Sequence, residues 1–168
     1  MLFPIDHGNS AMKTVNFVFP SGLIDNPIRP PVDTEMLEYD GKFWTLSGQR
    51  ISYMRDKTKD ERYWILTLFA IAKELEHRGA EHTASVHLAA GLPLTSFGRD
   101  KKSFRSYLYR DGSAIPFRYE GQDYTVTIQE VSLFPPGLCR RTDPDGTAGR
   151  AVRHCGGHWR LDGGSDAA

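Results

Sequence analysis

Cysteine is almost absent from this sequence, and the two copies lie near one end. Cys139 and Cys155 both follow Phe134 in a chain of 168 residues. A framework of disulfides is therefore excluded for most of the chain. An excess of one charge is also lacking, because 21 lysines and arginines balance 21 aspartates and glutamates. This balance excludes a protein that holds DNA or an anionic membrane by its overall charge.

Long hydrophobic runs are missing as well. Hydrophobic residues make up 39% of the chain. No uninterrupted apolar stretch approaches the roughly 20 residues that cross a bilayer. The first five residues are followed at once by Asp6 and His7, which is not the pattern of a secretory signal. We therefore expect a cytoplasmic, globular protein with no membrane partner, and its length suits one domain with a real core.

The composition of the chain changes abruptly near Pro135. Before this point the apolar residues follow helix and strand periods. After it the chain is mainly glycine, arginine, aspartate and small residues, with seven of the 16 glycines and no sustained period. We predict that residues 1–134 form the folded domain and that residues 135–168 are disordered.

The front of the folded part is typical of a small, mainly antiparallel sheet. Turn-forming residues between the first two apolar runs predict a hairpin around residues 6–13, and Asp40-Gly41 is a strong signal for a second one. The prolines between residues 27 and 31 predict a loop. The strands expected here span residues 2–5, 15–19, 37–39, 43–46 and 49–54.

The rest of the folded part mixes helices with strands. Asp60 is placed to cap a helix over residues 63–75, which is apolar nearly all round and must therefore be buried on more than one face. This order of elements predicts the α/β or α+β class with a mixed sheet. The other elements expected are a strand at 84–90, a helix at 100–109, and strands at 117–119, 124–128 and 131–134.

The loop from Asp6 to Lys13 contains residues that suit phosphate chemistry. Gly8 lets the backbone approach a ligand, Asn9 and Ser10 add short donors, and Lys13 brings a positive charge. Asp6 is able to hold Mg²⁺ through water. The same residues are also compatible with a plain β-turn that carries surface charges.

This loop and several later stretches of the chain resemble those of one protein family. The loop is similar to the phosphate-1 loop of the actin-like ATPase superfamily, in particular the bacterial plasmid-segregation actins of the ParM/StbA group. The resemblance spans residues 2–134, and the order and spacing of its stretches make it fairly specific. Further similar stretches are Phe19-Pro20-Ser21-Gly22-Leu23, Tyr39-Asp40-Gly41-Lys42-Phe43-Trp44, the helix from Tyr63 to Leu75, and Gly91-Leu92-Pro93-Leu94-Thr95-Ser96-Phe97-Gly98-Arg99-Asp100-Lys101.

The resemblance implies an actin-like fold of ribonuclease-H-like topology that binds ATP and Mg²⁺ between two such halves. This chain corresponds to the N-terminal half. If the roles of the matching family residues apply here, Asp6 contacts Mg²⁺ through water. The backbone around Gly8, Asn9 and Ser10 then holds the β- and γ-phosphates. Lys13 pairs with phosphate oxygens. Catalysis at such a site relies on positioning and electrostatics, with a polar side chain that orients the attacking water.

The resemblance also implies a function for the complete protein, which is ATP-dependent filament formation in DNA segregation. Such a filament is a homo-polymer that reaches DNA only through an adaptor. In this chain the stretch Phe134-Pro135-Pro136-Gly137 has no amide or carboxylate where the family places its water-orienting residue. We therefore expect no ATPase activity from the chain alone. The alternative is a non-catalytic interaction module, an orphan half-domain that binds a partner protein.

The tail after Pro135 is compatible with a shifted reading frame. If the codons from Pro136 onward are read from their second base, they permit the continuation FPQGYAAV that is typical of the family. Over Arg153 to Ala167 the same frame permits VIVADIGGWTVDLMR, which is similar to a strand followed by the phosphate-2 loop of the superfamily. Every position is permitted without a stop codon. We hypothesise a single-base insertion near codon 135.

Other candidate residues have ordinary explanations. Four possible zinc ligands, Cys139, His154, Cys155 and His158, match no standard zinc spacing. His7, His82 and His87 are expected to be packed or solvated histidines rather than acid/base groups. The basic run from Arg99 to Arg105 is compatible with DNA contact, but a solvated helix face is the more usual reason for such charge.

Overall fold

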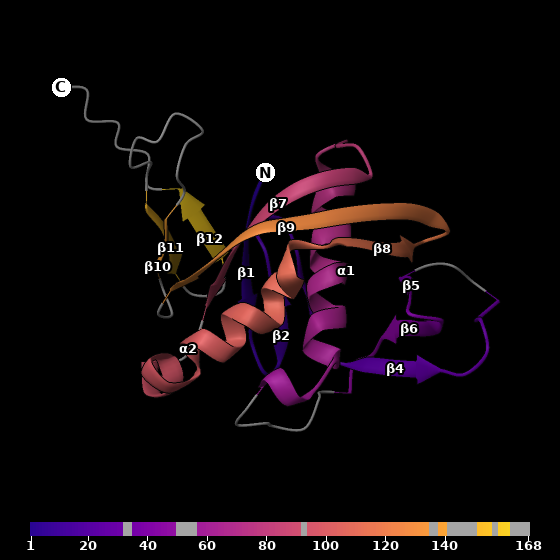
Figure 1. Cartoon of the computed structure of the whole chain (residues 1–168), viewed down its shortest axis with the longest axis horizontal. Coiled ribbons are helices and arrows are strands. Elements are labelled where there is room, and N and C mark those ends of the chain that lie inside the picture. Colours follow the sequence, from indigo (N-terminus) through magenta and orange to yellow (C-terminus); the bar gives the residue numbers. More distant parts are fainter. Residues whose placement is uncertain are drawn as a thin grey trace.

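A computed structural model of the protein describes residues 1–31, 35–49, 57–91, 94–134, 138–140, 151–155 and 158–161 (Figure 1). Its strands are β1 Leu2–His7, β2 Ala11–Lys13, β3 Val18–Pro20, β4 Leu23–Asn26, β5 Met36–Tyr39, β6 Lys42–Leu46, β7 Thr83–Gly91, β8 Ala114–Tyr119, β9 Gln122–Phe134, β10 Leu138–Arg140, β11 Ala151–Cys155 and β12 His158–Leu161. Its helices are η1 Lys57–Lys59, α1 Arg62–His77, α2 Leu94–Tyr109 and η2 Arg110–Gly112.

The main sheet is mixed, as the sequence predicts. Its nine strands follow the order β3-β2-β1-β7-β9-β8-β5-β6-β4. β1, β7 and β9 run parallel to one another, while β2 and β8 are antiparallel to their neighbours. Because parallel strands end at the same edge, the carboxyl ends of β1, β7 and β9 lie side by side. That edge carries the candidate site described below.

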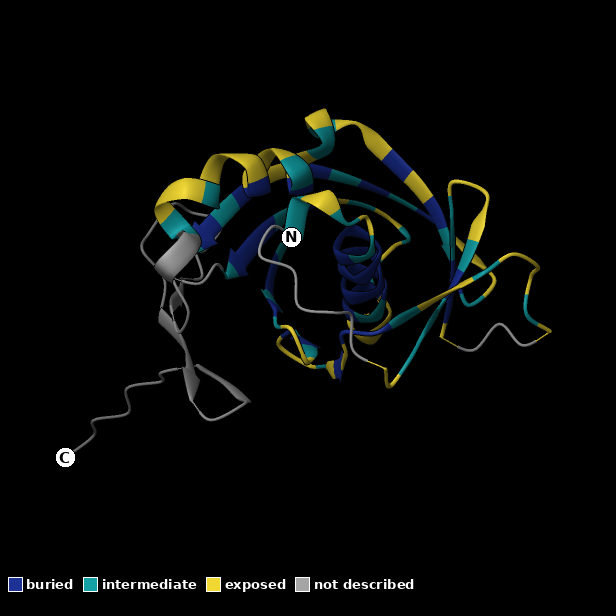
Figure 2. Cartoon of the chain, turned by 90° about the horizontal axis from the view of Figure 1, so that it is seen from below, coloured by how far each residue is buried: buried dark blue, intermediate teal, exposed yellow. Residues whose placement is uncertain are grey.

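The sheet curves around α1. Its two end strands, β3 and β4, are separated in the chain by Ser21 and Gly22 alone. Figure 2 shows α1 in dark blue in the middle of the molecule, with strands around it. Every residue from Tyr63 to Ala72 is buried, and Phe104 and Leu108 of α2 pack into the same core. The expectation that this helix is buried on more than one face is confirmed.

The tight hairpin predicted at Asp40-Gly41 is confirmed. Asp40 and Gly41 both have positive φ angles, 50° and 71°, between β5 and β6. Glu120 and Gly121 form the same kind of two-residue turn between β8 and β9, with φ angles of 49° and 77°. Two consecutive positive φ angles match the right-handed twist of paired strands. The helix begins at Arg62 with Glu61 as its N-cap residue rather than Asp60, although Asp60 Oδ1 accepts a hydrogen bond of 2.9 Å from the N–H of Arg62.

The prediction of one strand over residues 15–19 is wrong in part. The partner of β1 is β2, with Asp6 opposite Lys13, and the chain then turns again before β3. The N–H of Thr14 donates to the carbonyl of Phe17 at 2.8 Å across this turn. The reason lies in α1, whose buried Glu74 accepts hydrogen bonds from Thr14 and Asn16 and so holds them out of the sheet.

Two further elements differ from the sequence prediction. β4 has no strand signal of its own and forms by pairing with β6, with Asp25 opposite Trp44. α2 begins at Leu94 rather than at residue 100. The expected strand at 49–54 lies, except for Gln49, outside the described residues. No helix in the described part of the chain is long and apolar enough to span a membrane.

Beyond Phe134 the structure describes three short strands. β10, β11 and β12 form a separate antiparallel sheet. The division of the chain at residue 134 and the disorder of residues 135–168 stay predictions. The four possible zinc ligands of the tail have side chains outside the described part. Within that part no group of three metal-ligating side chains comes together.

Candidate functional site

The loop between β1 and β2 lies at the carboxyl edge of the parallel strands. Ile5 is opposite Ala90 in the β1–β7 ladder, and Gly91 is opposite Phe134 in the β7–β9 ladder. The next residue of β1, Asp6, therefore comes beside Gly91. A Cβ atom on Gly91 would lie 3.6 Å from Asp6 Oδ1, so the carboxylate faces the end of β7. Such an edge is where ligands bind in open α/β sheets.

The backbone of the loop is held from one side by Ser21. Its hydroxyl donates to the carbonyl of Gly8 at 2.7 Å, and its N–H donates to the carbonyl of Ser10 at 3.2 Å. In a trans peptide the C=O of one residue and the N–H of the next point in opposite directions. The N–H of Asn9 therefore points away from Ser21. This arrangement suits an anion, which binds to backbone N–H groups.

Glycine is required at two positions of this arrangement. A Cβ on Gly8 would lie 2.4 Å from the carbonyl oxygen of Ala11, which belongs to the same loop. A Cβ on Gly22 would lie 2.0 Å from the carbonyl oxygen of Gln49. Both distances are far below van der Waals contact, so a side chain at either position would displace backbone. Close approach of the backbone explains Gly8 without any positive φ angle.

His7 supports the loop from below. It is 2% exposed, and its ring meets the ring of Phe104 edge-on at 5.4 Å between centroids. Its Nε2 lies 2.9 Å from the hydroxyl of Thr67, which donates its own proton to the carbonyl of Tyr63. Nε2 is therefore the protonated nitrogen, and Nδ1 is buried without a hydrogen-bond partner. Burial, assisted by the nearby charge of Lys57, lowers the pKa of His7 to about 3.

Lys57 reaches the same loop from η1. Its Nζ donates to the carbonyl of His7 and lies 4.8 Å from the centre of the Tyr63 ring. Burial lowers the pKa of Lys57 to about 8, against the opposing effect of the Asp6 carboxylate. The hydroxyl of Tyr63 in turn donates to Asn9 Oδ1 at 3.3 Å. η1, through Lys57, and the beginning of α1, through Tyr63, are thus attached to the loop on the two sides of Gly8.

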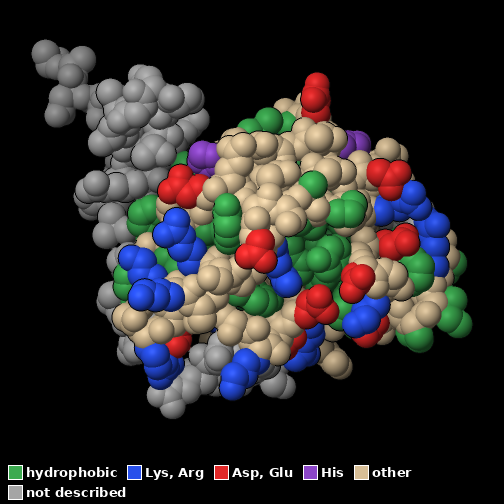
Figure 3. All heavy atoms as spheres, viewed as in Figure 1, with side chains coloured by type: hydrophobic (Ala, Val, Ile, Leu, Met, Phe, Trp, Pro, Cys, Tyr) green, Lys and Arg blue, Asp and Glu red, His purple; other side chains and the backbone are tan. Residues whose placement is uncertain are grey.

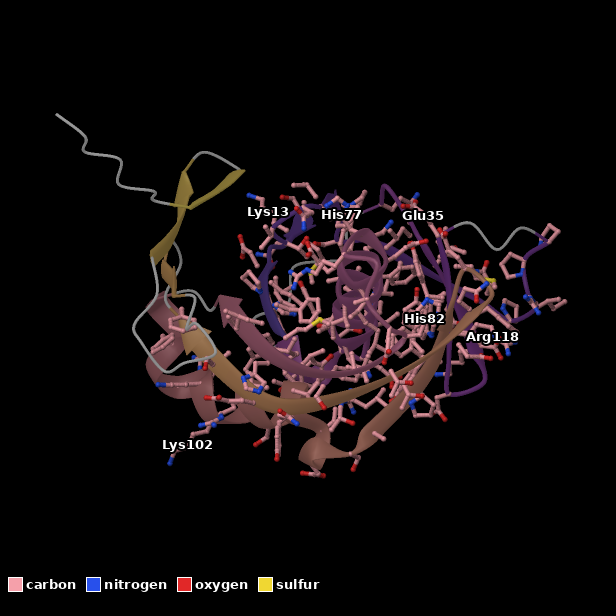
Figure 4. The ribbon with its side chains drawn as sticks, turned by 90° about the horizontal axis from the view of Figure 1, so that it is seen from above. Lys13, Glu35, His77, His82, Lys102 and Arg118 are labelled. Atoms are coloured by element: carbon pink, nitrogen blue, oxygen red, sulfur yellow. The ribbon has the colours of Figure 1, made fainter. Side chains whose placement is uncertain are left out.

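Lys13 lies across the hairpin from Asp6. The two residues are partners in the β1–β2 register, and both side chains are partly exposed. Figure 4 shows Lys13 on the side of the molecule away from Lys102 of α2. The structure therefore places an acidic and a basic residue opposite each other at the base of the loop.

All five residues predicted to bind the nucleotide lie on this one hairpin: Asp6, Gly8, Asn9, Ser10 and Lys13. Sequence reasoning missed the contributions of Ser21, Lys57 and Gly91. Ser21 and Gly91 lie in stretches that resemble the family, but nothing in the sequence indicates which atoms they meet. Lys57 belongs to a run of charged residues that carries no signal for a site. Residues 135–137, where a water-orienting residue is expected, lie outside the described part.

The other candidate residues behave as packing or surface residues. His82 stacks on Tyr124 with 4.3 Å between ring centroids, and Nε2 of His87 is 3.1 Å from Gln129 Oε1. Figure 3 shows lysine and arginine side chains gathered over α2 at the left of the molecule. The basic residues of this exposed face are Arg99, Lys101, Lys102 and Arg105.

The chain matches one protein family, and its fold is similar to solved structures. The family described as "Actin like proteins N terminal domain" matches residues 5–138. No curated protein matches the sequence. The structure of the AlfA filament bound to AMPPNP is similar, with a TM-score of 0.63, 16% identity, and coverage of 95% of this chain and 66% of that chain. At such low identity the likeness shows the fold.

Two other solved structures extend the comparison. A ParM filament from Clostridium botulinum has a TM-score of 0.62 and 18% identity, over 81% of this chain and 47% of that chain. Ta0583, an archaeal actin homolog in complex with ADP, has a TM-score of 0.61 and 17% identity, over 81% of this chain and 44% of that one. The chain thus spans about half to two thirds of the length of these proteins.

Proposed function

Because the chain belongs to the family of actin-like protein N-terminal domains, we propose that it forms one half of the nucleotide cleft of a plasmid-segregation actin of the ParM/StbA type. The observation that carries this proposal is the loop between β1 and β2. It joins a carboxylate, a glycine with no room for a Cβ and a lysine at the carboxyl edge of three parallel strands. The described fold is similar to a filament bound to AMPPNP and to a protein bound to ADP.

The residues of the loop fit Mg²⁺ and ATP. Asp6, beside Gly91, offers a carboxylate of the kind that holds Mg²⁺ through water. The backbone around Gly8, Asn9 and Ser10 would hold the β- and γ-phosphates, and Lys13 would pair with phosphate oxygens. When bound, Mg²⁺ neutralises charge that develops on the phosphates. The chain's own contribution is to orient the phosphates and to hold the loop rigid through Ser21, His7 and Lys57.

This half alone is expected to bind nucleotide weakly and not to hydrolyse it. Positioning of a terminal phosphate requires contacts from both sides of a cleft. With contacts from one side only, the favourable free energy of those contacts is small compared with the cost of restricting the translation and rotation of the ligand. In the complete protein we propose ATP-dependent assembly into a homo-polymer, which would reach DNA through an adaptor. The similarity to the AlfA and ParM filaments supports this proposal.

A titration of the 168-residue chain with Mg·ATP tests the nucleotide site. In two-dimensional NMR spectra we expect the backbone amide signals of residues 8–11 to shift, with an affinity weaker than micromolar and no phosphate release. Gly8→Ala should abolish these shifts, because its Cβ displaces the carbonyl of Ala11. Gly48→Ala is the matched control, since no atom of the described residues beyond its two chain neighbours lies within 4 Å of its added Cβ.

Two results would contradict this proposal. If the loop amides of the wild-type chain do not respond to Mg·ATP, the nucleotide site is wrong, and a non-catalytic module that binds a partner protein becomes the better interpretation. If the chain binds with micromolar affinity and turns ATP over, it is not an incomplete half of the cleft.

The tail carries a separate proposal, that a single-base insertion near codon 135 shifted the reading frame. The abrupt change of composition after Phe134 supports it, because seven of the 16 glycines and both cysteines lie beyond that residue. We expect resequencing of the locus to find the insertion and, in the shifted frame, a continuing actin-like protein with a phosphate-2 loop. A downstream sequence with no such continuation would contradict the proposal.

A further inference from the structure

Lys57 is a mostly buried cation that the proposed nucleotide contacts do not include. It begins η1, directly before α1, and its Nζ donates to the carbonyl of His7. The ring of Tyr63 covers the ammonium at 4.8 Å from the ring centre. Lys59, two residues further on the same turn, is exposed. The fold therefore brings one of these two lysines, and not the other, against the loop.

The ammonium of Lys57 is only partly compensated. A lysine ammonium has three hydrogen-bond donors, and the carbonyl of His7 accounts for one of them. The carboxylate of Asp6 acts on it electrostatically and is also the proposed Mg²⁺ residue. A metal ion bound at Asp6 would neutralise that carboxylate, and its stabilising effect on the Lys57 ammonium would become smaller. A buried cation in this position favours an additional anion.

Lys57 is attached to the part of the loop that we propose as the phosphate-binding backbone. Its bond goes to the carbonyl of His7, immediately before Gly8, while Tyr63 binds the side chain of Asn9, immediately after it. Lys13 lies opposite Asp6 on β2. The loop therefore has a lysine on β2 and a second one below it, which is an arrangement suited to a polyphosphate rather than to a single phosphate.

We propose that Lys57 is a further phosphate-binding residue, whose ammonium binds the terminal phosphate of ATP and so distinguishes ATP from ADP. This inference rests on the proposed nucleotide site. Asp6 would hold Mg²⁺ through water, and the ion would neutralise charge on the phosphates. The charge of Lys57 lies near enough to the Asp6 carboxylate to interact with it, so we expect its ammonium to meet the phosphate that only the triphosphate has. Its effect should therefore be larger for ATP than for ADP.

The test compares Mg·ATP with Mg·ADP in NMR titrations of the full 168-residue chain. Lys57→Met should weaken the binding of Mg·ATP about tenfold or more, and that of Mg·ADP by less than about threefold, because a charge-assisted contact is lost only with the triphosphate. Lys57→Arg should recover part of the difference. Lys59→Met, on the exposed side of the same turn, should bind both nucleotides as the wild type does.

A second measurement avoids the risk that Lys57→Met does not fold. In the wild-type chain with ¹³C-labelled lysines, we expect the side-chain signal of Lys57 to shift on addition of Mg·ATP and to change little with Mg·ADP. Equal loss of affinity for both nucleotides in Lys57→Met, or a Lys57 signal that does not distinguish them, overturns the inference while the nucleotide site stands. A wild-type chain that binds neither nucleotide overturns the proposed site itself.

Discussion

Replacement of Glu74 by alanine is expected to remove a large part of the stability of the fold. Glu74 is 1% exposed, and its two carboxylate oxygens accept five hydrogen bonds, from Thr14, Asn16 and Arg78. Removal of one partner from a buried charged network costs up to about 3–5 kcal/mol. Here the buried hydroxyl of Thr14 loses an acceptor, whereas Asn16 and Arg78 are exposed and can bind water instead. A domain of this size has a free energy of unfolding of about 5–15 kcal/mol. Urea unfolding followed by tryptophan fluorescence measures the loss.

A matched variant separates this network from a general effect of changes in α1. Glu76 lies two residues further along the helix and is exposed. Glu76→Ala should change the free energy of unfolding by about 0.5 kcal/mol or less. Glu74→Gln should lower the free energy of unfolding by about 2 kcal/mol. Its amide NH₂ group would face hydrogen-bond donors of the network and could not accept from them. If Glu74→Ala unfolds at the same urea concentration as Glu76→Ala, the network does not stabilise the fold.

The Glu74 network also makes the fold sensitive to strong acid. Burial alone would raise the pKa of Glu74, but hydrogen bonds from Thr14, Asn16 and Arg78 outweigh burial and lower this pKa. A carboxylate with a lowered pKa in the folded state stabilises the fold above its ordinary pKa. That contribution is lost as the pH falls through the folded pKa.

Acidification from pH 7 to pH 5 is expected to cost the wild-type chain about 2 kcal/mol of stability through His7 alone. The folded pKa of His7 is about 3, whereas its ordinary value is 6.5. Above pH 6.5 the ring is neutral in both states, so stability does not depend on it. Between pH 6.5 and pH 3 only the unfolded chain binds the proton. Stability therefore falls by about 1.4 kcal/mol for each pH unit in this range.

The control for this prediction is a side chain that keeps the hydrogen bond to Thr67 but does not titrate. His7→Gln supplies an amide donor, and its free energy of unfolding should be nearly constant between pH 7 and pH 5. His77→Gln should show the same drop as the wild type, because His77 is exposed. The measurement is urea unfolding at several pH values. A wild-type stability that does not change in this range, or a drop that persists in His7→Gln, would show that His7 is not buried in its neutral form.

Glu74 and His7 hold the same hairpin onto the core. Glu74 binds the turn that follows β2, and His7 binds Thr67 of α1 at the end of β1. The proposed phosphate loop lies between them. Its geometry therefore depends on two buried polar groups of which neither is expected to touch the nucleotide.

Much of this site could be predicted from residue types. Asp6, Gly8 and Lys13 stand close together in the sequence, so a single hairpin is enough to bring them together. Lys57 and Gly91 are 51 and 85 residues from Asp6 in the sequence. Only the crossover through α1 and the parallel pairing of β1 with β7 bring them to the loop. No local pattern in the chain contains that information.

The sequence by itself determined the mixed sheet, the tight hairpin at Asp40-Gly41, the buried helix and the hairpin that carries the proposed phosphate loop, because each follows from local periodicity or turn chemistry. The tertiary structure decided where strands begin and end around Thr14–Phe17 and Leu23–Asn26. It also decided which polar side chains are buried. The physical reason is that hydrogen bonds to a buried group such as Glu74 outweigh the weak strand preference of a few residues.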